Sequence, residues 1–218
     1  PTKFVKGKRS LKYRRMKKLL IFHSTIAPYR ISFFNDLYKA FDTKICLRYK
    51  NLRSQQFDYE RISSQFCFSP IYLKELFQWK GRTFNSGYWK VLNEFRPNVV
   101  FVEEFSIGAI FVLLHRFFTR GNYKIVSICD DSYNMVADNN DFSQFHKWSR
   151  KIIAPLIDEI ILVEPKVQKW YQDKYQKGVW FPIIKPDNKA REEYTRTIDL
   201  SNQILKDKHL ENKCVFLY

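Results

Sequence analysis

The stretch KLLIFHSTIAPYRISFFNDLYKAF, residues 18–41, contains a short apolar run, a turn and an amphipathic segment. The run at 18–22 is typical of a buried strand. After the turn, apolar residues recur at the spacing of one helix face, at Ile31, Phe34, Leu37, Tyr38 and Phe41. A strand that leads through a turn into a helix is the usual beginning of a nucleotide-binding α/β domain. Such turns are commonly rich in glycine, whereas this one contains Pro-Tyr-Arg at 28–30.

The rest of the chain repeats this alternation. Strand-like apolar runs lie at 43–49, 98–105, 123–131, 158–164 and 178–184, with weaker ones at 66–68 and 71–76. Helical patterns lie between them at 88–95, 107–118, 143–156 and 166–175. Strands this apolar, separated by segments of helix length, predict a parallel sheet covered on both faces. The predicted fold class is α/β, with a Rossmann-like, doubly wound and mostly parallel sheet in three α/β/α layers.

Length and composition predict one globular domain or slightly more, since 45% of the 218 residues are hydrophobic. The formal net charge is +16. Residues 1–15 hold seven basic residues and no acidic one, and we expect them to be a disordered basic extension. Either this extension has no role, or it is an arm that contacts anionic lipid or nucleic acid.

The four cysteines lie far apart without a CxxC pair, which disfavours both a zinc site and a disulfide framework. A reduced, cytoplasmic protein is therefore expected. No apolar run reaches the roughly 18 residues of a membrane span. The nearest, 105–118, is interrupted by His115 and Arg116 and is better explained as a buried helix.

Candidate site residues follow from the predicted sheet. In open parallel sheets, ligands bind outside the carboxyl ends of the strands. The polar residues at these predicted ends are His23, Tyr29, Arg30, Glu103, Glu104, Asp130, Asp131 and Glu164. A pocket with one imidazole, one guanidinium and several carboxylates suits a polyhydroxyl ligand better than a polyanion.

Structural alternatives exist for the residues around the first turn. Arg30 begins a helix, where its charge opposes the helix dipole, so it needs a carboxylate or a ligand anion as partner. Tyr29 could simply pack against the sheet edge. His23, at the end of an apolar strand, is more often a core histidine than a site residue.

The acidic pairs also allow two interpretations. Asp130 and Asp131 are adjacent carboxylates that repel each other, so one must face water, a cation or a hydrogen-bond donor. Asp131 could equally cap the segment that follows. Glu103 and Glu104 pose the same problem, because alternation sends their side chains to opposite sides of the strand.

Several motifs are absent from the sequence. It contains no GxxxxGK[ST], GxGxxG, GxSxG or HExxH pattern. This disfavours nucleoside triphosphate hydrolysis, dinucleotide binding by the usual turn, and serine hydrolysis. No cluster of metal ligands is visible, and we expect neither a metal nor a cofactor.

The order of these segments resembles that of a known family. MKKLLIFHSTIAPYRISFFNDL, residues 16–37, resembles the opening of family 4 glycosyltransferases of the GT-B fold, several of which carry a Pro-Tyr-Arg turn. FRPNVVFVEE (95–104) and KIIAPLIDEIILVEPKVQKWYQDKY (151–175) are similar to two later segments of that family. IIKPDNK (183–189) stands where the family has an "i-p-N-G-v-D" turn, and KCVFLY (213–218) is similar to the first strand of its second domain.

The resemblance implies a Rossmann-like acceptor-binding domain at 16–185, followed at 186–218 by a linker helix and the first strand of a donor-binding domain. It implies an enzyme of the hexosyltransferase type that uses a nucleotide-sugar as substrate, without a cofactor. The acceptor would be a glycan or a lipid-linked molecule in cell-surface polysaccharide synthesis. The family's Glu-x7-Glu donor motif is absent. We therefore expect the chain to be the front part of a longer protein and inactive alone, with donor-binding residues unknown.

The resemblance also implies roles for residues. The family often has a histidine at the reaction centre after the strand that corresponds to 123–129, and here that position is Asp130. The expected catalytic residues are Asp130 and Asp131. The expected acceptor-binding residues are His23, Tyr29, Arg30, Glu103 and Glu104. The Pro-Tyr-Arg turn would offer a ring for stacking on a sugar and a forked donor for hydroxyls or phosphate.

Two partners beyond the sugar substrates follow from the charge. The excess of Lys and Arg, with Trp and Tyr nearby, is compatible with a peripheral enzyme at the inner face of an anionic membrane. The main alternative function is a basic nucleic-acid-binding α/β module, which the lack of a recognition motif makes unlikely. A receiver-like signalling domain is a weaker alternative, because such domains are shorter and place their acidic pair after the first strand.

Overall fold

The computed structural model describes residues 16–51, 57–79, 82–137, 143–182 and 187–210. Its centre is a seven-stranded sheet in the order β3-β2-β1-β6-β7-β8-β9, and all of its strand pairs are parallel. The strands are β1 (Lys18–His23), β2 (Asp42–Leu47), β3 (Ile71–Tyr72), β6 (Val99–Glu103), β7 (Lys124–Cys129), β8 (Glu159–Leu162) and β9 (Val179–Trp180). β4 (Glu75–Trp79) and β5 (Arg82–Asn85) form a separate antiparallel hairpin.

The sheet is doubly wound. From β1 the chain proceeds outward to β2 and β3, then crosses back to the other side of β1 and continues through β6 to β9. The strand order therefore reverses between β1 and β6, which is the switch point where open α/β sheets bind their ligands. The predicted Rossmann-like, doubly wound α/β fold is confirmed.

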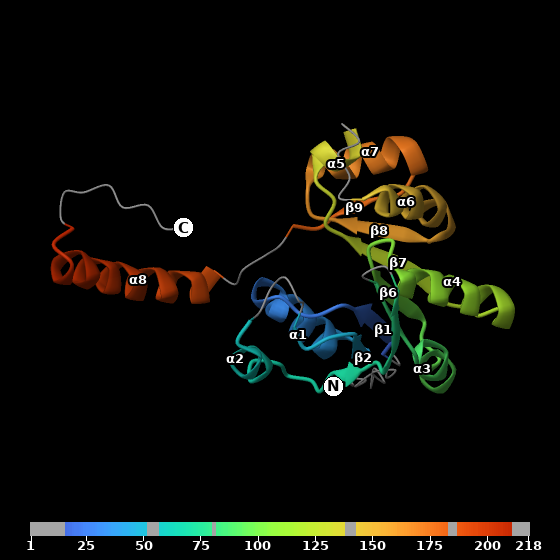
Figure 1. Ribbon diagram of the computed structural model, residues 1–218, viewed down its shortest axis with the longest axis horizontal. Coiled ribbons are helices and arrows are strands. Elements are labelled where there is room, and N and C mark those ends of the chain that lie inside the picture. The colour runs from blue at the N-terminus through green and yellow to red at the C-terminus, as the bar shows by residue number, and fades with distance from the viewer. Residues whose placement is uncertain (1–15, 52–56, 80–81, 138–142, 183–186, 211–218) are drawn as a thin grey trace, which may run out of the picture.

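Helices cover both faces of the sheet (Figure 1). The longer helices are α1 (Ile31–Ala40), α3 (Tyr88–Phe95), α4 (Ile107–Thr119), α6 (Gln144–Leu156) and α7 (Pro165–Tyr175), and the short ones are η1 (Pro28–Arg30), α2 (Tyr59–Ser63) and α5 (Tyr133–Ala137). α1 and α2 pack on one face, and α3, α4, α6 and α7 pack on the other.

The central strand β1 shows why the strands of this sheet are continuous apolar runs in the sequence. In β1, Leu20 and Phe22 belong to the core under α3, α4, α6 and α7, whereas Leu19 and Ile21 belong to the core under α1. Successive side chains of a strand point to opposite faces. A strand covered on both sides therefore needs an apolar residue at every position.

The weaker strand predictions needed correction. Residues 66–68 are not a strand: Phe66 and Phe68 stack on each other with ring centroids 5.0 Å apart and pack into the core under α1. The run at 71–76 is divided between β3 and the start of β4. The last predicted strand, 178–184, is a strand only at 179–180, and its final two residues lie outside the described ranges.

Helix α8 (Asp187–Asp207) lies apart from the layers of the sheet in Figure 1. It lies within 186–218, where the resemblance implies a linker helix, and apolar side chains along it, such as Ile198, Leu200 and Ile204, are exposed. The predicted extension at 1–15 and the predicted strand at 213–218 lie outside the described residues. The domain boundary placed at 185 stays a prediction.

Candidate functional site

The first group of polar side chains lies at the switch point of the sheet. β1 ends at His23 and the neighbouring β6 ends at Glu103, and His23 Nδ1 lies 3.7 Å from Glu103 Oε1. The Ser24 hydroxyl donates a hydrogen bond to the same oxygen. Arg48, which follows β2, donates to Glu103 Oε2 at 2.8 Å. We call His23, Ser24, Arg48 and Glu103 the switch-point cluster.

Glu103 is ionised within this cluster. Burial alone would raise its pKa, but the charges of His23 and Arg48 and the hydrogen bond from Ser24 outweigh burial and hold the pKa below its usual value. Burial lowers the pKa of His23, against the opposing charge of Glu103. The Nδ1 of His23 lies 2.7 Å from the Thr25 carbonyl oxygen, which can only accept, so we assign a proton to Nδ1, from which it is donated to Thr25.

The second group surrounds Asp131, whose side chain is 0% exposed. His146 Nε2 donates to Asp131 Oδ1 at 2.9 Å, and Arg150 and Tyr171 donate to Oδ2 at 2.9 Å and 2.5 Å. Burial would raise the pKa of Asp131, but these hydrogen bonds and the Arg150 charge lower it to about 2. Asp131 is thus a permanent buried anion that orients His146. We call Asp131, His146, Arg150 and Tyr171 the Asp131 cluster.

Glu104 lies between the two clusters. Its φ of 45° is in the left-handed region, which is unfavourable for a side chain with a Cβ. The backbone there is held by a hydrogen bond from its N–H to the Ile128 carbonyl at 2.8 Å and by one from the Ser127 hydroxyl to its own carbonyl at 2.9 Å. Glu104 Oε2 lies 3.8 Å from His146 Nδ1. The unfavourable turn therefore aims the carboxyl group at His146.

The pKa values of Glu104 and His146 are both shifted upward. Burial, followed by the charge of Glu103, raises the pKa of Glu104 to about 7. The hydrogen bond to Asp131 raises the pKa of His146. A group whose pKa is close to the working pH is well suited to general acid or base catalysis.

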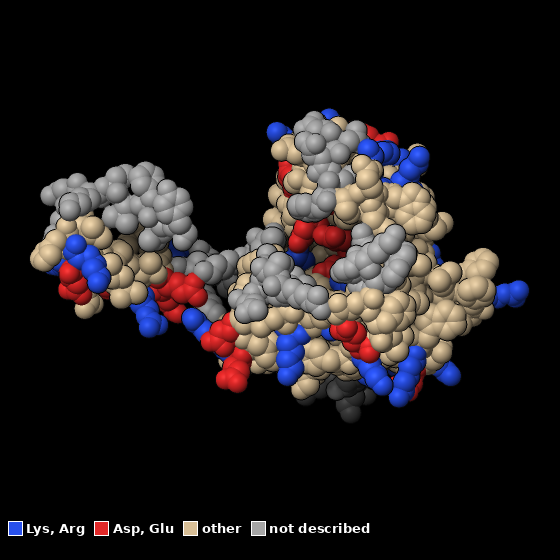
Figure 2. Space-filling model, viewed as in Figure 1, with Lys and Arg blue, Asp and Glu red and all other residues tan. Residues whose placement is uncertain are grey.

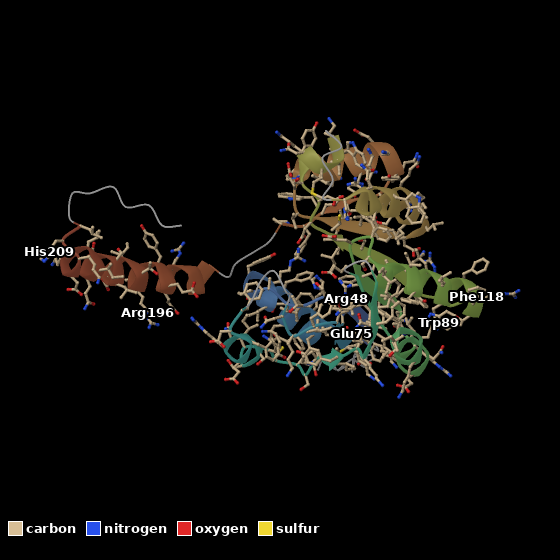
Figure 3. All side chains as sticks on the ribbon, viewed as in Figure 1. Arg48, Glu75, Trp89, Phe118, Arg196 and His209 are labelled. Carbon is tan, nitrogen blue, oxygen red and sulfur yellow. The ribbon has the colours of Figure 1, made fainter. Side chains whose placement is uncertain are left out.

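These residues open into a polar cavity. Arg48, Glu104 and His146 line a cavity of about 320 Å³, together with hydroxyl groups of Thr83, Ser106, Ser143 and Ser149. Figure 2 shows acidic side chains gathered in a recess near the centre of the view, and Figure 3 labels Arg48 below that recess. The cavity offers charged and neutral hydrogen-bonding groups at several sides, as a ligand with many hydroxyl groups requires.

The Pro-Tyr-Arg turn lies at a different hollow. Arg30 is buried and forms an ion pair with Asp130, which is the carboxylate partner that its position at a helix start requires. Tyr29 is exposed, with its ring centroid 5.9 Å from the Arg30 guanidinium carbon. Both residues border a mostly apolar groove of about 590 Å³ between α1 and the sheet, lined also by Phe33 and Phe101.

The structure brings most of the predicted site residues into contact, in three separate sets. His23 meets Glu103, Arg30 meets Asp130, and Glu104 and Asp131 both meet His146. Glu164 is engaged elsewhere and accepts a hydrogen bond from the backbone N–H of Tyr133 at 3.1 Å. The catalytic and acceptor-binding roles of these residues stay predictions.

Sequence reasoning missed Arg48 and His146. Arg48 lies in the apolar run 43–49, which predicts a position inside a strand, but β2 ends at Leu47, so Arg48 is a strand-end residue like the others. A predicted strand that ended at Leu47 would have placed Arg48 among the candidate residues. His146 lies on α6, away from any strand end, and no local signal indicated it.

A pH dependence of stability follows from Glu104. In the unfolded chain this carboxyl group loses its proton near pH 4.5, and in the folded protein near pH 7. Between these values the folded state binds more protons, so its stability should fall as the pH rises. Urea unfolding near pH 5 and near pH 8 should show a larger fall for the wild type than for Glu104→Gln. Equal falls in both proteins would contradict this assignment.

The sheet order defines a Rossmann-like α/β domain, and the polar cavity beside its switch point is its candidate ligand site. No family model and no curated protein matches the sequence. In fold, the chain is similar to a structure assigned to a UDP-N-acetylglucosamine 2-epimerase from Listeria monocytogenes, with 14% identity, a TM-score of 0.50, and coverage of 73% of this chain and 42% of that chain. A second structure, of a UDP-N-acetylglucosamine 2-epimerase, has 10% identity and a TM-score of 0.47, with coverage of 72% and 45%.

At these identities the likeness shows the fold alone. The chain spans less than half of the length of either structure. None of the helices within the described ranges is long and apolar enough to cross a membrane. Among the same residues, no group of three or more His, Cys, Asp and Glu side chains is placed to hold a metal ion.

Proposed function

We propose that this chain is the acceptor-binding portion of a glycosyltransferase of the GT-B fold, similar to family 4, that transfers a sugar from a nucleotide-sugar. The acceptor would be a glycan or a lipid-linked molecule in cell-surface polysaccharide synthesis. The observation that carries the proposal is the Glu104–His146 pair, which faces a polar cavity opposite Arg48. The fold likeness to enzymes named for a nucleotide-sugar substrate supports this class of enzyme.

In the proposed reaction, an acceptor hydroxyl oxygen forms a bond to the anomeric carbon of the donor sugar. The bond from that carbon to the phosphate oxygen breaks, and the nucleoside diphosphate leaves. The hydroxyl proton passes to the Glu104 carboxylate, which lies 3.8 Å from His146. Arg48 binds acceptor hydroxyl groups. Asp131, which the sequence predicts to be catalytic, is 0% exposed, so we give it a positioning role through His146 instead.

Asp130 and the Pro-Tyr-Arg turn form the second part of the proposed site. The Asp130 side chain is 41% exposed at the carboxyl end of β7, and the buried Arg30 holds it in place. It remains our candidate for contact with the sugar at the reaction centre. The exposed ring of Tyr29 is free to stack on a sugar face. Donor-binding residues are expected outside the described residues.

The acidic character of the strand ends disfavours a nucleic acid as the ligand of this site. Glu103, Glu104, Asp130 and Asp131 lie within two neighbouring strand ends, and the nearby Arg30, Arg48 and Arg150 are each engaged with one of these carboxylates rather than arranged along a phosphate backbone. Nucleic-acid binding would require basic residues elsewhere and would weaken steeply with salt. The hydroxyl groups of a polyhydroxyl ligand, by contrast, can accept hydrogen bonds from the basic side chains of the site and donate them to its carboxylates.

The test is turnover of nucleotide-sugars by the full-length gene product, with a membrane extract as acceptor. Arg30→Ala and Asp130→Ala should each lower turnover by about tenfold or more, because both remove part of one ion pair at the site. Glu94→Ala is the control, because this carboxylate is exposed on α3. It should leave turnover unchanged.

Two outcomes would reject the proposal. If no nucleotide-sugar is consumed, the chain is not part of a glycosyltransferase. If UDP-N-acetylglucosamine is converted to its C2 epimer without release of UDP, the protein is an epimerase, like the structures that share its fold. Product analysis by chromatography distinguishes these results from sugar transfer.

A further inference from the structure

An apolar groove separates α4 from α6 on the face of the protein away from α1. Its volume is about 620 Å³, and its lining includes Leu114, Phe117, Trp148, Ile152 and Leu156. Among the described residues, neither the switch-point cluster nor the Asp131 cluster lines this groove. The groove and the Asp131 cluster share only helix α6. The groove is therefore a surface distinct from the polar cavity.

Large apolar side chains around this groove are exposed to solvent. Phe117 is 76% exposed, Phe118 66% and Trp148 56%. Figure 3 labels Phe118 at the far end of α4, close to Trp89 of α3, and their ring centroids are 6.3 Å apart. Isolated exposed hydrophobic residues are common, but a contiguous patch of this size marks an interaction surface.

The two helices that form the patch carry only basic charges, and Arg116 in the groove is paired with Asp158, which follows α6. The sequences of α4 (107–119) and α6 (144–156) contain no Asp or Glu. Lys147, Lys151 and Arg120 are exposed around the apolar side chains. Figure 2 shows mostly uncharged surface over α4 and α6, bordered by basic side chains. Aromatic side chains within a basic border match the interface of an anionic bilayer, where tryptophan is enriched and lipid phosphates attract Lys and Arg.

The patch is continuous with the polar cavity. Ser106 and Ile107 at the start of α4 line the cavity, as does Phe145 at the start of α6. The Phe145 and Trp148 rings lie 6.1 Å apart, one at the cavity and the other at the groove. The patch therefore reaches the edge of the cavity at Phe145.

We propose that the face formed by α4 and α6 docks on an anionic membrane. Phe117, Phe118 and Trp148 enter the boundary between headgroups and acyl chains, and Lys147 and Lys151 contact lipid phosphates. The proposed function supplies a reason for this contact, namely access to a lipid-linked acceptor. The docking itself is a property of the surface and can be measured without sugar transfer.

The test is flotation of the whole chain with vesicles of phosphatidylcholine that contain phosphatidylglycerol. The wild type should float with these vesicles and not with pure phosphatidylcholine. Phe117→Ser/Phe118→Ser should lower the partition coefficient by at least about tenfold, because two apolar side chains no longer enter the bilayer. Lys147→Glu/Lys151→Glu should have a similar effect at low salt and a smaller one at high salt.

The matched control is Tyr194→Ser/Ile198→Ser on α8, which also replaces two exposed apolar side chains. It should bind vesicles like the wild type. Circular dichroism should show unchanged folding of every variant, since the replaced side chains are exposed. Unchanged binding of Phe117→Ser/Phe118→Ser would overturn the proposal, as would a wild-type dimer that this variant converts to monomer without any vesicle binding. Vesicle binding without sugar turnover would retain this inference and reject only the proposed function.

Discussion

Replacing Asp131 by alanine should lower the free energy of unfolding by about 3–5 kcal/mol. The carboxylate is 0% exposed and accepts hydrogen bonds from His146, Arg150 and Tyr171. Its removal takes the ion pair away from a buried guanidinium and the acceptor away from a buried hydroxyl. Breaking a buried ion pair costs far more than a surface pair contributes.

Urea unfolding followed by circular dichroism near pH 7 measures this change. Asp173→Ala, an exposed carboxylate on α7, is the control and should change stability by less than about 0.5 kcal/mol. Asp131→Asn should lie between the two, because the amide keeps one acceptor oxygen but no charge. A loss below about 1 kcal/mol for Asp131→Ala would show that Asp131 does not hold this cluster together.

Replacing Glu104 by glutamine should lower the turnover number of the proposed glycosyltransferase by about 10²–10⁴. The amide fits the same space beside His146 but cannot accept a proton. Because the pKa of Glu104 is raised to about 7, the wild-type rate should increase with pH through this range as the carboxyl group becomes ionised. The variant should lose this dependence.

Rates across a pH series with the same nucleotide-sugar and acceptor check this prediction. Glu94→Gln repeats the same chemical change at an exposed position and should keep the wild-type profile. Substrate binding should remain in Glu104→Gln, so that the loss falls on the turnover number rather than on KM. Retention of more than about a tenth of the wild-type rate would exclude Glu104 as the proton acceptor.

The regular elements were predicted most accurately where local signals agreed. Helix α3 has its predicted bounds, 88–95, because the apolar spacing there is helical and Pro97 follows it. β1 extends only one residue beyond the predicted 18–22. The hairpin of β4 and β5 was missed, because its strands expose Leu76 and Phe77 and lack the alternation of a half-buried strand.

The two neighbouring aspartates show where sequence reasoning ended. It named Asp130 and Asp131 as one acidic pair, but the structure directs them to different partners. Asp130 meets Arg30 from a position 100 residues earlier, whereas Asp131 is enclosed by residues of α6 and α7. Which neighbour a side chain meets depends on how distant helices pack, and adjacent positions on the chain carry no information about it.

The sequence by itself determined the class of fold and the sheet edge that carries the polar residues. Both depend on local patterns: apolar runs on strands buried on both faces, and the rule that parallel strands end at a common edge. Only the tertiary structure decided which of those residues share a cavity, and that Arg48 and His146 join them. The tertiary structure also decided the pKa of Glu104. Burial and neighbouring charges shift a pKa only after folding has placed the carboxyl group beside those charges.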